Sequence, residues 1–199
     1  DLHGGDLPDA VDVVIVGGGY TGLHAALALR KAGATVAVLE QATVGWGASS
    51  RNGGMALTGL KLELPSLVRR YGPDTARRLW TWSLDALDHL RRTLAEEQID
   101  CDYAQSGHLL LAAKPQHYAA MAHEVEWMAQ TFGYHALRAV PPGELGGEIG
   151  SGEFHGGLID GGSGGLHPAK YVYGLAAAAI RRGAALVEQA QVTGLLRRV

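Results

Sequence analysis

Residues 11–22, VDVVIVGGGYTG in one-letter code, decide the fold of this chain. The β-branched run at their start is typical of a buried strand, and it ends at Gly17. Residues 21–32 are rich in Ala and Leu, which indicates a helix that stops at Gly33. A second β-branched run covers residues 35–40. The order predicts a βαβ unit whose two strands are parallel.

Three glycines in this stretch, Gly17, Gly19 and Gly22, follow the spacing GxGxxG between strand and helix. The first permits a tight turn, the second lets the backbone approach a pyrophosphate, and the third lets the helix pack close to the strand. The helix N-terminus offers unpaired N–H groups and the positive end of its dipole to phosphates. Glu40 lies at the end of the second strand, 18 residues after Gly22. There its carboxylate can accept hydrogen bonds from the ribose hydroxyls, and its negative charge repels the 2′-phosphate of NADP. The pattern predicts dinucleotide binding but does not separate NAD from FAD.

A second Gly-rich segment, GWGASSRNGGM at residues 45–55, comes directly after the second strand. Here the sequence resembles the D-amino acid oxidase superfamily of FAD-dependent oxidoreductases, in which a GASxRNGG-like segment follows the ribose-binding acid. The resemblance implies that FAD is the cofactor and that the segment runs along its pyrophosphate toward the flavin. The likeness continues through residues 99–102, 106–109 and 164–168, in an order similar to the gamma-glutamylputrescine oxidase branch.

The motif and the resemblance together assign the cofactor-binding residues. They are Gly17, Gly18, Gly19, Tyr20, Thr21, Gly22, Glu40, Gln41, Ala48, Ser49, Ser50, Arg51, Asn52, Gly53, Gly54 and Val192. Glycine N–H groups and the forked cation of Arg51 suit anionic oxygens, although a surface loop with an unrelated arginine is the alternative. Val192 is expected in the last strand with its backbone beside the adenine, and a plain core valine is the alternative there.

The remaining patterns predict an α/β fold, a Rossmann-like FAD-binding domain interrupted by part of a smaller α+β substrate domain. Residues 10–98 and 160–199 are assigned to the first domain and residues 99–159 to the second. A long amphipathic helix is expected from Pro73 to about Glu97, with Trp80 and Trp82 in the core. Further strands are expected near residues 107–113, 137–140, 156–160 and 185–192, and further helices near 115–131 and 169–182.

Composition excludes several other classes of protein. The 199 residues carry a net charge of −3 with dispersed basic residues, which argues against nucleic acid as a partner. No apolar run is long enough to span a bilayer, and the lone Cys101, expected to be a small buried residue, cannot form an internal disulfide. We therefore expect a cytoplasmic protein. Histidine spacing indicates no metal site, and His167, before a proline at a helix start, is expected to cap or pack rather than to catalyse.

The resemblance implies a flavin enzyme that oxidises a small-molecule amine or amino acid by hydride transfer to the flavin. A dehydrogenase that uses an acceptor other than oxygen, and an FAD-binding half that is inactive by itself, are the alternatives. No catalytic residue can be named from the sequence. Family members are roughly twice this length, within ordinary domain sizes. The expected partner is therefore the C-terminal half of the same enzyme or a completing subunit, without which sheet edges stay unpaired.

Overall fold

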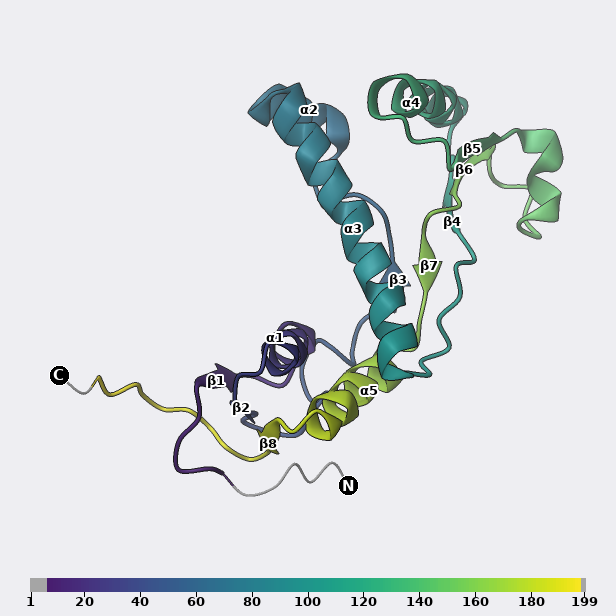
Figure 1. The fold of residues 1–199 in the computed structure, drawn as a ribbon. Coiled ribbons are helices and arrows are strands. Elements are labelled where there is room, and N and C mark those ends of the chain that lie inside the picture. The colour runs from purple at the N-terminus through teal and green to yellow at the C-terminus, as the bar shows by residue number, and fades with distance from the viewer. Residues whose placement is uncertain (1–6, 198–199) are drawn as a thin grey trace. The chain divides into compact units, whose positions relative to one another are not determined.

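The predicted βαβ unit is present in the computed structural model of the chain, which describes residues 7–197 (Figure 1). Strand β1 (Val13–Val16), helix α1 (Tyr20–Lys31) and strand β2 (Val36–Leu39) follow one another as expected, and the two strands pair in parallel. Strand β8 (Ala185–Val187) pairs in parallel with the other edge of β2, which gives the order β1-β2-β8. Helices α1 and α5 (Pro168–Arg181) pack against each other beside this sheet.

The chain divides into two compact units. Within the described residues, one unit comprises residues 7–54, 92–102 and 166–197, and it holds the parallel sheet. The other comprises residues 55–91 and 103–165. The assignment of residues 10–98 and 160–199 to a cofactor domain and of 99–159 to a substrate domain stays a prediction.

The first strand is only half buried, which corrects the expectation of a buried one. Val14 and Val16 expose 53% and 62% of their surface, while Val13 and Ile15 on the opposite face are partly buried. The reason is that β1 lies at the edge of its sheet and α1 covers one face. Parallel sheets are normally covered on both faces, so this side of β1 is an uncovered apolar surface in the described residues.

The last strand is shorter than predicted, so Val192 does not lie in it. Strand β8 ends at Val187 because its partner β2 ends at Leu39, and the pairing has no further backbone to extend along. Gln189 then adopts a positive φ of 56° and turns the chain. The amides of Gln189 and Ala190 donate to the carbonyls of Ala42 and Glu40, which keeps the following segment close to the end of β2.

The second unit contains an antiparallel sheet with the strand order β4-β6-β5. Its strands are β4 (His108–Leu111), β5 (Leu137–Val140) and β6 (Gly157–Asp160), and helix α4 (Pro115–Phe132) packs on one face. The core between helix and sheet is formed by Ala112, Met121 and Leu158 with partly buried neighbours. Sequence patterns predicted all of these elements to within a few residues.

Several short elements were not predicted. They are the two-residue strands β3 (Met55–Ala56) and β7 (Gly164–Gly165), which pair with each other, helix α2 (Leu64–Tyr71) and the 3₁₀ helix η1 (Pro142–Gly147). The long helix α3 (Pro73–Glu97) has the predicted bounds. Trp80 is buried as expected, whereas Trp82 exposes 64% of its surface. Residues two apart point to different sides of a helix, so both could not enter one core. No helix in residues 7–197 is long and apolar enough to cross a membrane.

Candidate cofactor-binding site

The turn between β1 and α1 requires glycine at two positions, Gly17 and Gly22. Gly17 has a φ of 102°, in the region that L side chains rarely adopt. A Cβ atom on Gly22 would lie 2.1 Å from the carbonyl oxygen of Gly17, so the third glycine of the motif allows the helix to start against the turn. Gly19 is the N-cap of α1 and has no side chain to cap the helix. The first turn of α1 therefore presents N–H groups and the positive end of the helix dipole.

Glu40 is held in place by backbone groups on both sides. Its carboxylate accepts hydrogen bonds from the amides of Gly18 at 2.8 Å and of Ala42 at 3.0 Å. Its own amide donates to the carbonyl of Val187 at 2.9 Å, which ties the end of β2 to β8. The acid at the end of the second strand thus contacts the glycine turn directly.

Two hollows meet at Glu40 and Gln41. The strand-end hollow has a volume of about 270 Å³ and is lined by Val16, Gly17, Leu39, Glu40, Gln41, Ala190, Gln191 and Val192. The helix-end hollow has a volume of about 200 Å³ and is lined by Gly18, Gly19, Glu40, Gln41, Gly45, Trp46, Gly47, Ala48 and Ser49. Glu40 therefore lies between the two hollows. The strand-end hollow is at the carboxyl ends of the parallel strands, and the helix-end hollow is beside the start of α1.

Residues 45–54 fold into successive turns that hold themselves together. The Ser50 hydroxyl donates to the carbonyl of Gly45. The side-chain amide of Asn52 donates to the backbone carbonyls of Ala48 at 2.9 Å and Ser49 at 3.3 Å. The Ser49 hydroxyl in turn accepts the amide of Tyr20 at 3.1 Å, at the first residue of α1. The segment is thereby fixed against the helix start.

Arg51 and Trp46 form a pair on the outside of this segment. The guanidinium carbon of Arg51 lies 4.4 Å from the centroid of the Trp46 ring, within range of a cation–π interaction. Trp46 is 58% exposed even though it is a large aromatic residue. An exposed tryptophan in the wall of a hollow, with a cation stacked on it, provides both an apolar surface and a positive charge.

Contacts between α1 and α5 fix the direction of the helix start. The Tyr20 hydroxyl donates to the carbonyl of Pro168 at 3.0 Å, and its ring lies 5.0 Å from that of Tyr171. The Tyr171 hydroxyl lies 2.6 Å from Nε2 of His24. Burial raises the pKa of the Tyr171 hydroxyl above its ordinary value, so the group stays neutral. His167 is the N-cap of α5, where Nδ1 accepts the amide of Lys170 at 3.4 Å, and Cys101 is buried, both as expected.

The structure places the predicted residues in three ways. Those in the lining of the two hollows are Gly17, Gly18, Gly19, Glu40, Gln41, Ala48, Ser49 and Val192. Tyr20, Gly22, Ser50 and Gly54 instead support the lining from behind or beside it, and Gly54 meets the carbonyl of Leu166 so closely that a Cβ atom would lie 2.0 Å away. Thr21 on α1 and Arg51, Asn52 and Gly53 on the segment are exposed without lining either hollow.

The predicted residues lack seven that line the hollows, which are Val16, Leu39, Gly45, Trp46, Gly47, Ala190 and Gln191. Five of them are direct neighbours of predicted residues or members of the Gly-rich segment, and Trp46 among them carried a usable signal, since an aromatic residue between two glycines in a polar loop is unusual. Ala190 and Gln191 carried none, because a turn far along the chain brings them back to β2.

Comparison with known proteins identifies the family. The profile of the FAD dependent oxidoreductase family (DAO) matches residues 12–199, nearly the whole chain. The chain belongs to this family. FAD is the family's cofactor, which resolves the choice that the glycine motif leaves open. The resemblance to the D-amino acid oxidase superfamily is confirmed.

Two curated relatives are similar to this chain over most of its length. It is 35% identical over 185 residues to the probable oxidoreductase OrdL of Haemophilus influenzae, covering 93% of the chain and 43% of that protein. It is also 35% identical over 183 residues to the gamma-glutamylputrescine oxidoreductase of Escherichia coli, covering 92% of the chain and 42% of that protein. The chain therefore spans about two fifths of the length of these relatives.

Solved structures share the fold at lower identity. Glycine oxidase from Geobacillus kaustophilus matches with a TM-score of 0.74 and 24% identity, covering 90% of this chain and 46% of that one. L-amino acid deaminase from Proteus myxofaciens matches with a TM-score of 0.78 and 21% identity, covering 98% of this chain and 41% of that one. At these identities the likeness supports the fold.

Proposed function

We propose that this chain forms the dinucleotide-binding part of an FAD-dependent enzyme that oxidises amines or amino acids. The observation that carries the proposal is the pair of hollows that meet at Glu40, one of them beside the start of α1. An elongated dinucleotide has a pair of phosphates between two larger groups. The site has a matching order, with the strand-end hollow on one side of Glu40 and the helix-end hollow, beside the start of α1, on the other. The glycine turn leaves room for the backbone to approach such a ligand.

The residues suit FAD in their chemistry as well as in their order. Glu40 takes the hydroxyls of the adenosine ribose, and the strand-end hollow, with Val192 in its wall, takes the adenine. The Gly19 amide and the N-terminal end of α1 face the phosphates, with Arg51 as the nearby cation. The other predicted residues hold these groups in place.

Bound FAD supplies the acceptor for a hydride from the carbon next to the substrate nitrogen, which leaves an imine that water hydrolyses. The part played by this chain is to hold the cofactor in one orientation. Tyr20 and Tyr171 fix the start of α1, and the Ser49 hydroxyl fixes the Gly-rich segment to it. Because the turn is already ordered, no part of the binding free energy is lost to ordering it when the cofactor binds.

We further propose that the missing part of the enzyme covers the open side of β1. The relatives are more than twice as long as the match, and Val14 and Val16 are exposed on a strand type that is normally buried on both faces. We call the chain joined to that missing part the complete enzyme. The 199 residues alone are expected to aggregate or to unfold without cooperativity. A monodisperse monomer of 20.9 kDa with a cooperative melting transition would contradict this expectation.

The first test is the intact mass and absorption spectrum of the purified complete enzyme, before and after denaturation. A yellow protein that releases free FAD supports the cofactor proposal, and a colourless one contradicts it. Amine-dependent bleaching of the flavin without oxygen then tests the chemistry. Oxygen is then admitted to the reduced enzyme. Release of one hydrogen peroxide per amine oxidised identifies an oxidase, and a reduced flavin that oxygen does not reoxidise to give peroxide identifies a dehydrogenase. Bound FAD that no amine or amino acid reduces contradicts amine oxidation.

A further inference from the structure

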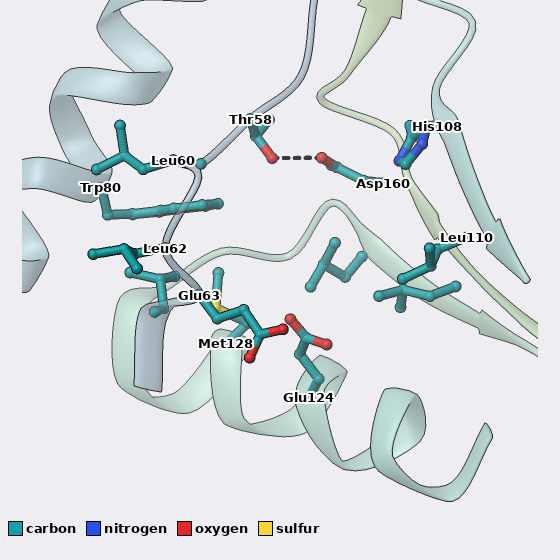
Figure 2. Close-up of a pocket in the computed structure, with 14 residues that line it drawn as sticks. Thr58, Leu60, Leu62, Glu63, Trp80, His108, Leu110, Glu124, Met128 and Asp160 are labelled. Atoms are coloured by element: carbon teal, nitrogen blue, oxygen red, sulfur yellow. Dashed lines mark hydrogen bonds between the residues drawn. The ribbon is translucent and has the colours of Figure 1, made fainter. Parts of the chain in front are cut away.

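A second cavity lies within the other compact unit, among residues that the proposed FAD site does not use. This open cavity has a volume of about 210 Å³ and lies between the face of the β4-β6-β5 sheet that carries α4, helix α4 itself and residues 58–64 (Figure 2). An apolar cavity of about 150 Å³ can bind a benzene molecule. That is room for a small organic molecule.

The middle of the cavity is apolar. Trp80, Met128 and Leu158 form a buried floor, with exposures of 6%, 2% and 7%. Leu60 and Leu110 stand on the rim and expose 48% and 49% of their surface. Leucines on a rim above a buried aromatic floor leave apolar surface in water that a bound alkyl group would cover.

One end of the cavity is polar, with Asp160 in its wall and His108 beside it. The Asp160 carboxylate accepts hydrogen bonds from the hydroxyls of Thr58, Tyr134 and Ser163 and from the amide of Gly162. Burial opposes its charge, yet these hydrogen bonds outweigh burial and lower the pKa of Asp160 below its ordinary value. Asp160 therefore fixes the wall of the cavity and has little capacity left for a ligand.

The opposite end carries two carboxylates that face each other. Figure 2 shows Glu63, just before α2, and Glu124, on α4, pointing toward one another at the mouth of the cavity. Within the described part of the chain, no hydrogen bond or ion pair reaches either carboxylate. Partial removal from water raises the pKa of Glu124, and the charge of Glu63 raises it further. Two acids have thus been brought together beside apolar surface without a positive partner from the same unit.

We propose that this cavity binds a small alkylammonium ion, with its nitrogen between Glu63 and Glu124 and its alkyl group over Trp80. A cation between the two carboxylates replaces their repulsion by two charge-assisted hydrogen bonds. The alkyl group covers the exposed leucines of the rim. A neutral alcohol of the same shape fills the cavity without the ionic contacts, and a carboxylic acid anion is repelled. The site goes beyond the proposed oxidation and does not depend on it.

The test uses tert-butylammonium with the complete enzyme as purified. This ion has no hydrogen on the carbon next to nitrogen, so the enzyme cannot oxidise it there, and tert-butanol is a neutral comparator of the same shape. Isothermal titration calorimetry measures binding of each probe. Tighter binding of the ammonium ion than of the alcohol is expected. Glu124→Gln and Glu63→Gln should each weaken ammonium binding about tenfold, the effect of losing one charge-assisted hydrogen bond.

Glu126→Gln is the matched control, because Glu126 lies on the same helix but does not line the cavity. It should bind tert-butylammonium like the unchanged enzyme. Equal affinities for ammonium and alcohol, equal losses in Glu124→Gln and Glu126→Gln, or no binding because the missing part fills the cavity would each overturn the proposal. A colourless enzyme that still shows the expected pattern separates this inference from the FAD proposal, which alone would then fail.

Discussion

Replacing Gly22 by alanine tests whether close packing of α1 on the glycine turn shapes the FAD site. The added Cβ atom would lie 2.1 Å from the Gly17 carbonyl oxygen, whereas ordinary contacts begin at 3.4 Å, so backbone must move by about 1.3 Å. Ile15 Cγ2, at 3.1 Å, blocks retreat toward the strand. Overpacking against backbone costs about 3 kcal/mol, and the better helix propensity of alanine returns about 1 kcal/mol. The expected net destabilisation is about 2 kcal/mol.

The assay has two readouts. Denaturant unfolding of the FAD-free complete enzyme gives the loss of stability, and flavin fluorescence during reconstitution gives the Kd for FAD. The Kd should rise at least about tenfold, because a displaced turn misaligns the amides offered to the phosphates. Gly143→Ala is the control, because its Cβ atom meets nothing within 4 Å and the residue lines neither hollow, so the stability should change by less than about 0.5 kcal/mol and the Kd for FAD should stay the same. A Gly22→Ala protein as stable and as tight for FAD as the unchanged one would refute the steric reasoning.

Three further predictions follow from contacts in the two units. Glu40→Gln removes the charge proposed to bind the ribose and should raise the Kd for FAD about tenfold, measured by flavin fluorescence; an unchanged Kd contradicts the assignment. Trp46→Leu removes the ring beneath Arg51 and should raise that Kd about two- to fivefold, since an exposed cation–π contact contributes about 0.5–1 kcal/mol. The lowered pKa of Asp160 means that its carboxylate stabilises the fold fully above its unfolded pKa of about 3.9, and that this contribution is lost as pH falls through the lower folded pKa. Urea unfolding between about pH 3 and pH 6 should show this loss in the unchanged enzyme and not in Asp160→Asn.

Local signals account for the elements that the sequence predicted correctly. The helix α3 begins at Pro73 because proline suits the first helical turn, and leucines at helical spacing define its buried side. The βαβ unit depends on neighbouring residues in the same way. Glu40 could be assigned a role because the motif fixes its position relative to the glycine turn, and its contact with Gly18 agrees with that position.

The elements that were missed depend on distant partners. The strands β3 and β7 are two residues long and form only because residues 108 and 110 positions apart pair, so neither strand has a sequence period of its own. Helix α2 has two turns, too few for its apolar spacing to stand out. Val192 was expected inside a strand because its β-branched side chain suits one, but the available partner had already ended. A strand's length depends on its partner as much as on its own residues.

The same distinction explains why the two proposed sites differ in how far the sequence reveals them. The FAD site is assembled around one turn and one strand end, so a dozen neighbouring residues carry its signature. The cavity of the second unit is assembled from the loop before α2, from α3, from α4 and from three strands, and its two carboxylates are 61 positions apart. Glu63 alone resembles a helix-start acid, and Glu124 alone a solvated residue on an amphipathic helix. Only the folded unit places them together. Two neighbouring carboxylates beside apolar surface attract an organic cation, which neither residue would do alone.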